Sequence, residues 1–87
     1  MDQRKLDLQQ EVEVGYQAEG LIEKLNPYFD MMELQLIKGI RACSVADTES
    51  LHNIKLQLHA LDKLRFNIQS VIDTGKLATN ELEKDHE

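Results

Sequence analysis

The stretch Leu51–Ile72, LHNIKLQLHALDKLRFNIQSVI, decides the fold. Its apolar residues recur at alternating steps of three and four, and only Arg65 interrupts the series, which consists of Leu51, Ile54, Leu58, Leu61, Ile68 and Ile72. This spacing is typical of a helix that packs one side against another helix. We predict a helix from Thr48 to Thr74, about 40 Å long at 1.5 Å per residue.

A second helix is predicted from Pro27 to Cys43. Asn26 is a good helix cap, and proline suits the first helical position because its missing N–H is no loss there. The apolar stripe of this helix supplies the expected core of a helical hairpin, namely Phe29, Met32, Leu36 and Ile40.

Residues 44–50, SVADTES, are rich in capping residues and are predicted to form the turn of the hairpin. Ser44 with Asp47 fits the pattern of a helix start, while Asp47 and Thr48 are equally good candidates for the cap itself. Upstream, the spacing of apolar residues predicts an N-terminal helix over Leu6–Leu25, weakened by two glycines.

The chain therefore reads as one all-α domain, 1–87, with an N-terminal helix (1–25), a hairpin of two long antiparallel helices (26–75) and a frayed extension (76–87). The long helix has more apolar surface than its shorter partner covers, so part of its apolar face needs either the N-terminal helix or another subunit, and we expect a homo-oligomer. Its predicted interface is Leu51, Ile54, Leu58, Leu61, Arg65, Ile68 and Ile72. Arg65 either snorkels past the apolar contacts or fixes the register through a carboxylate, in this chain or in another subunit.

The size and composition of the chain also favour self-association. A domain of 10.0 kDa buries only about 60% of the surface of its unfolded chain. Cys43 is the single cysteine, so neither an internal disulfide nor a cysteine zinc site can supplement the core, which leaves self-association. The sequence begins without an apolar signal region and has no run of ~20 apolar residues, so we expect an intracellular protein without membrane contact.

The segment Ile72–Ala78, IDTGKLA, resembles the end of a phosphate-binding loop but fails its pattern twice. Ser70 stands where the loop needs its first glycine, and Leu77 follows the lysine where a hydroxyl is required. Gly75 is instead expected to end the helix or to lie within it as a packing glycine; the sequence leaves both alternatives open.

Catalysis and cofactor binding are not expected. His52 and His59 are two helical turns, about 10.5 Å, apart, too far to share a metal ion. The serines lack an activating base, and thin helices offer little concavity. The formal charge of −6 and the scattered Lys55, Lys63 and Arg65 argue against nucleic-acid binding by this chain alone.

The segment from Asn26 to Ala78 resembles small helical-hairpin proteins of tailed bacteriophages, often encoded among genes for virion assembly and DNA packaging. The resemblance rests on five short matches: Tyr28-Phe29, Ala46-Asp47-Thr48-Glu49, Leu58, Leu61-Asp62, and Ile72 to Ala78. Tryptophan, which is common in the hairpin helices of that group, does not occur in this chain. The group offers no functional residue to carry over.

The resemblance implies a non-enzymatic accessory or structural protein of virion assembly, in the host cytoplasm or the virion, with itself or other virion and packaging proteins as partners. One alternative is a DNA-packaging or regulatory protein that contacts nucleic acid or a packaging motor. Another is a small acidic inhibitor of a host protein.

Overall fold

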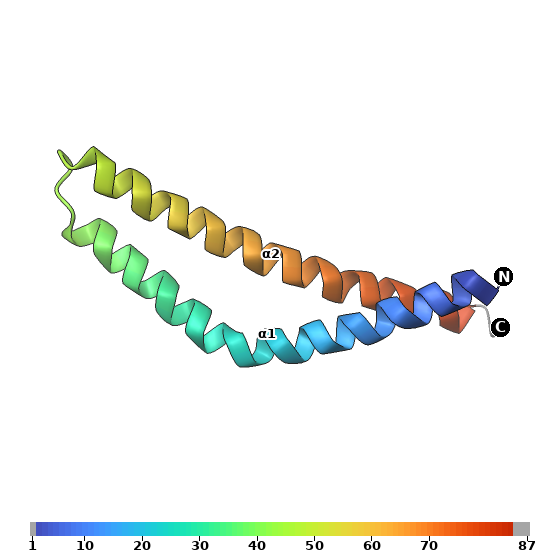
Figure 1. Ribbon diagram of the computed structural model, residues 1–87. Coiled ribbons are helices and arrows are strands. Elements are labelled where there is room, and N and C mark those ends of the chain that lie inside the picture. The colour runs from blue at the N-terminus through green and yellow to red at the C-terminus, as the bar shows by residue number, and fades with distance from the viewer. Residues whose placement is uncertain (1, 85–87) are drawn as a thin grey trace.

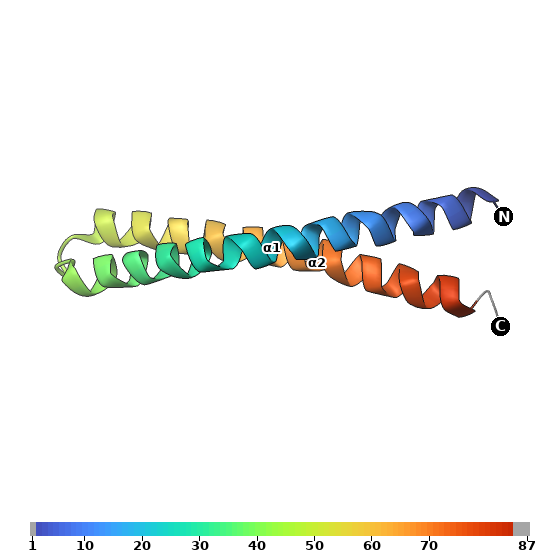
Figure 2. The ribbon, with the colours of Figure 1, turned by 90° about the horizontal axis from the view of Figure 1, so that it is seen from below.

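The computed structural model describes residues 2–84, which form two long antiparallel helices joined by a short turn (Figure 1). Helix α1 spans Asp2–Ala42 and helix α2 spans Thr48–Lys84. The molecule measures 62 × 21 × 17 Å, and the beginning of α1 and the end of α2 lie opposite the turn (Figure 2). The predictions of an all-α chain and of an antiparallel helical hairpin are confirmed.

The N-terminal helix is not separate, so the prediction of a break at Asn26-Pro27 is wrong. Pro27 lies inside α1, which runs on for another 15 residues to Ala42. A proline within a helix loses one backbone hydrogen bond and clashes with the carbonyl four residues earlier, which bends the helix without necessarily ending it. Helix α1 changes direction near its middle (Figure 1). Phe29, just beyond the proline, is buried, so packing on α2 holds the bent helix together.

The core is a narrow seam between the two helices. Its buried apolar side chains are Leu8, Phe29, Leu61, Ile72 and Ala78, each 2–6% exposed. Two of the four predicted core residues are misplaced: Met32 is 49% exposed and Ile40 is 37% exposed. The seam follows Phe29, Leu36 and Cys43 at steps of seven, and the positions between them are occupied by Glu33 and Gly39. Phe29 and Leu36 were thus predicted on the correct face of the helix. The seam positions Glu33 and Gly39 each lie one residue away from the predicted Met32 and Ile40.

The turn is fixed by Asp47, which settles which residue caps α2. Its carboxylate accepts a hydrogen bond from the backbone N–H of Ser50 at 3.2 Å, the geometry of an N-cap. Hydrogen bonds from the side chain and the backbone of Ser50 hold the pKa of Asp47 below its ordinary value of 3.8. Ser44 supports the turn from the other side, because its hydroxyl accepts a hydrogen bond from the N–H of Ala46 at 3.2 Å.

Gly75 lies within α2, so a helix end at this residue is ruled out. The two helices approach closely here: a Cβ atom built on Gly15 would lie 2.9 Å from the Cα of Gly75, and one on Gly75 would lie 2.9 Å from the Cα of Gly15. Of the two roles that the sequence left open, the packing role is the one observed. Beyond it, α2 continues to Lys84, and Glu81 pairs with Arg4 at 2.6 Å. The last part of the predicted extension, 85–87, lies outside the described residues.

Candidate protein-interaction surfaces

The seven residues predicted to form an interface lie along the side of α2 that faces α1. Leu61 and Ile72 are buried, and the other five are half-buried: Leu51, Ile54, Leu58, Arg65 and Ile68. Ile54, for example, packs against Gly39 of α1: a Cβ atom built on Gly39 would lie 3.3 Å from Cδ1 of Ile54. The stripe is thus used inside one chain, because α1 is long enough to cover it. Contact of these residues with a second chain stays a prediction.

Arg65 finds carboxylate partners within its own chain. Its guanidinium lies 2.9 Å from Oδ1 of Asp30 and 3.5 Å from Oε2 of Glu33, both on α1. It also lies over the ring of Phe29, 5.3 Å from the centroid, which is a cation–π geometry. Its Nε is buried without a hydrogen-bond partner. This cluster ties one turn of α2 to one turn of α1 and so specifies the register of the hairpin.

One flank of the hairpin carries exposed apolar side chains from both helices, which we call the apolar face. It consists of Val14, Leu21, Tyr28 and Met32 of α1 and Ala60, Leu64 and Val71 of α2. Val14 and Val71 line one shallow hollow of this face, and Met32, Ala60 and Leu64 line another. Leu21 and Tyr28 follow Val14 at steps of seven residues and therefore lie on the same side of α1. Leu21 is 51% exposed and Leu64 is 48% exposed.

The apolar face also lacks carboxylates along most of its length. Between Val14 and Gln35 on α1, and between Gln57 and Thr74 on α2, the positions on this side hold apolar, amide or hydroxyl side chains and two cations, Lys24 and Lys63, the second lying seven residues before Ser70 of the first hollow. Acidic residues enter only toward the chain ends, where Asp7 and Glu11 line the first hollow.

The opposite flank is charged. It includes Glu19, which lines a hollow with Lys76, and the ion pairs of Arg65 with Asp30 and Glu33. The acidic charge of the chain is therefore distributed unevenly around the hairpin.

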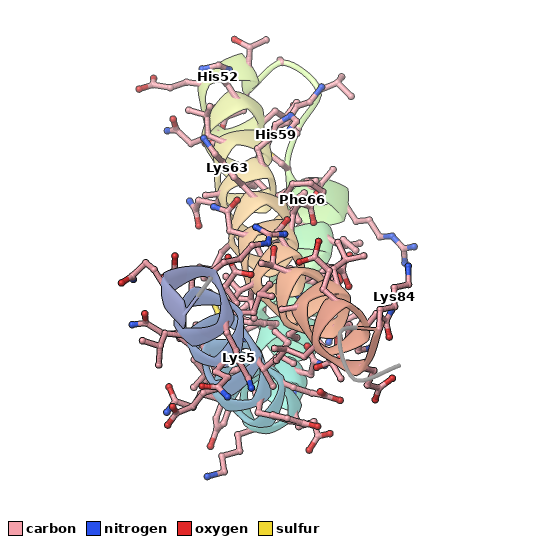
Figure 3. The ribbon with its side chains drawn as sticks, turned by 90° about the vertical axis from the view of Figure 1, so that its right-hand side faces the viewer. Lys5, His52, His59, Lys63, Phe66 and Lys84 are labelled. Carbon is pink, nitrogen blue, oxygen red and sulfur yellow. The ribbon has the colours of Figure 1, made fainter. Side chains whose placement is uncertain are left out.

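A third feature is a locally basic part of α2. Between Ser50 and Ile72 the only carboxylate is that of Asp62. Exposed His52, His59, Lys63 and Phe66 project from this part of the helix (Figure 3). Phe66 is 70% exposed, the largest exposed fraction of any aromatic side chain in the described part of the chain.

The remaining candidate groups are not brought together. Both histidines stay on the surface of α2, and among residues 2–84 no three His, Cys, Asp or Glu side chains gather in a cluster able to hold a metal ion. Gly75-Lys76 sits in mid-helix, so its backbone N–H groups serve helix hydrogen bonds and not a phosphate. Neither α1 nor α2, as described, has a segment of the length and hydropathy needed to cross a membrane.

Comparison with known proteins adds no relative: no family model, no curated protein and no solved structure matches the chain. The three surface features must therefore be interpreted from their own chemistry.

The apolar face was not among the sites predicted from sequence. Its signal was present in the seven-residue steps of Val14, Leu21 and Tyr28 and of Leu64 and Val71, which lie one position away from the seam.

Proposed function

We propose that the chain is a non-enzymatic, phage-encoded accessory or structural protein that self-associates and acts in virion assembly, in the host cytoplasm or in the virion. The observation that carries this proposal is the apolar face, which is shared by both helices and carries no carboxylate between Val14 and Gln35 or between Gln57 and Thr74. The phage context comes from the sequence resemblance, and the mode of action comes from the surface.

The thin core supports self-association. Among the residues that the structure describes, five apolar side chains are buried, and many large ones remain 37–90% exposed. Two helices bury little surface by themselves, and small domains of this kind are commonly stabilised by association with further helices. A protein that gains most of its core on assembly is suited to a structural role, because folding and assembly then reinforce each other.

Sedimentation equilibrium over a hundredfold range of protein concentration tests this proposal. We expect the molar mass to rise above the 10.0 kDa of one chain as concentration increases. Helical content measured by circular dichroism should rise in parallel, because association stabilises the folded state. A molar mass that stays at one chain over the whole range, with constant helical content, would remove the basis for self-association.

A second candidate function, DNA packaging or regulation through contact with nucleic acid, is favoured by the basic part of α2. Lys55 and Lys63 are exposed, and Phe66 offers a face for base stacking. Because so few cations are involved, log affinity should fall with log salt concentration with a slope of only about −2 to −3.

Fluorescence anisotropy with labelled duplex and single-stranded DNA at several salt concentrations measures that slope. The variant Lys55→Glu/Lys63→Glu should abolish any binding, and Lys24→Glu, on the apolar face, is its matched control. Absence of binding at 20 mM salt would exclude this candidate.

A further inference from the structure

We infer that the apolar face is the site where a second copy of this chain docks, so that two hairpins stack face to face into a four-helix bundle. This inference rests on the proposed self-association and adds the surface and the arrangement. It assigns the contact to the flank of the hairpin and not to the stripe of α2 that already packs on α1.

The amount of exposed surface fits a second copy. The accessible surface is 6974 Å². A compact monomer of 10.0 kDa is expected to expose about 5,200 Å², so the hairpin exposes about 1,800 Å² in excess. A stable interface of standard size buries about 800 Å² on each partner. Docking one copy on one flank would thus remove about half of the excess surface.

The distribution of charge indicates which flank of the hairpin forms the contact between two copies. The chain carries a net charge of −6, so two copies repel each other wherever their carboxylates meet. On the apolar face, the residues between Val14 and Gln35 and between Gln57 and Thr74 include no carboxylate, so two copies that meet there bring no carboxylates together along these stretches. The centres of protein interfaces are depleted of charged residues and enriched in aromatic residues and methionine, and the apolar face contains Tyr28 and Met32. Lys24 and Lys63 are both exposed, and long lysine side chains at the edge of an apolar surface can keep their ammonium groups in water.

The polar side chains of the face favour an identical partner. Gln35 and Gln57 line the hollow that also contains Met32 and Leu64. An amide carries both a donor and an acceptor, so it can pair with the same group of a second copy across a twofold axis. A partner rich in carboxylates or ammonium groups would instead leave buried charges without partners on this face.

The two tyrosines allow a test in the unmodified protein. Tyr28, on the apolar face, is 63% exposed in one chain, and Tyr16, outside that face, is 68% exposed. Hydroxyl-radical footprinting with mass spectrometry should show oxidation of Tyr28 falling at least about fivefold as protein concentration is raised through the association range. Oxidation of Tyr16 should stay within about twofold. Protection of Tyr16 without protection of Tyr28 would overturn the assignment while leaving self-association intact.

Substitutions provide the second arm of the test. Leu21→Glu and Leu64→Glu, one on each helix, should each raise the dissociation constant at least about a hundredfold, because a twofold interface buries each new carboxylate twice. Phe66→Glu is the matched control at a more exposed apolar residue, and it should change the constant by less than about threefold.

Circular dichroism at high concentration checks that each variant is helical, and the footprint of the wild-type protein stands even if one variant does not fold. The assignment fails if Phe66→Glu dissociates the protein as strongly as Leu64→Glu, or if neither face variant has an effect. If the wild-type protein stays at the mass of one chain at every concentration, both the assignment and the proposed self-association fail.

Discussion

Replacement of Gly75 by alanine should destabilise the protein, whereas the same replacement at Gly20 should stabilise it. Both glycines lie inside helices, where alanine is intrinsically better by about 1 kcal/mol. They differ in what the added methyl group meets. At Gly75 it would lie 2.9 Å from the Cα of Gly15 and 3.1 Å from the carbonyl oxygen of Glu11, while at Gly20 it meets nothing within 4 Å.

The magnitude follows from these distances. Carbon atoms in favourable contact lie about 3.5–4.0 Å apart, so the helices must separate by about 0.5–1 Å at Gly75 to admit the methyl group. The obstacle is backbone, which cannot rotate away as a side chain does. Overpacking of this kind costs about 1–3 kcal/mol, and it loosens the adjacent contacts of Ile72 and Ala78 as well. We therefore expect Gly75→Ala to lose up to about 2 kcal/mol net and Gly20→Ala to gain about 1 kcal/mol.

Thermal unfolding followed by circular dichroism measures both effects. For a chain of this size, 1 kcal/mol corresponds to about 4–8 °C in the unfolding midpoint. The variants must be compared at one protein concentration, because association shifts the midpoint. Gly15→Ala should behave as Gly75→Ala does. If Gly75→Ala instead raises the midpoint as much as Gly20→Ala, the close approach of the two helices is not present and the reasoning is refuted.

Three further predictions concern the seam and the turn. Phe29→Ala should lose about 3–5 kcal/mol of unfolding free energy in urea titrations, because it empties the largest buried position and removes the ring beneath Arg65. Arg65→Met should be neutral or stabilising by up to about 1 kcal/mol, since a half-buried charge with an unpaired Nε is replaced by an apolar chain and its two carboxylate partners remain hydrated; a loss as large as that of Phe29→Ala would contradict this reasoning. Asp47→Ala should lower the unfolding midpoint at neutral pH. Because the pKa of Asp47 is lower in the folded state, the stabilising contribution of its carboxylate is complete above pH 3.8 and is lost as pH falls through the lower folded value. The unfolding curves of the wild-type protein and of Asp47→Ala should therefore converge in acid. Asp47→Asn should keep the cap and lose the pH dependence.

The hairpin was predictable from sequence because its two main signals are local. The three- and four-residue steps of Leu51–Ile72 encode one helix face, and the capping residues at 44–50 encode the turn. Each signal depends on neighbours within a few residues. The predicted beginning of α2 at Thr48 was accordingly correct.

The errors arose where contacts distant in sequence override local preference. Pro27 has the local signature of a helix start, but the burial of Phe29 against α2 keeps α1 continuous through it. Gly75 has the signature of a helix end, but its contact with Gly15, 60 residues away, gives it a packing role. Met32 was expected in the core, but the half-buried position beside it is held by Glu33, which pairs with Arg65 of α2, and Met32 is 49% exposed.

The hairpin connectivity also dictates an order of folding. Contacts near the turn, such as that of Gly39 with Ile54, close loops of about 15 residues, whereas the contact of Arg4 with Glu81 closes a loop of 77. Short loops lose less entropy on closure, so the seam should form first beside Asp47 and extend toward the chain ends. The glycine contact would then form after the rate-limiting step. Its disruption should leave the folding rate almost unchanged and accelerate unfolding, so Gly15 and Gly75 govern how long the closed hairpin persists once formed.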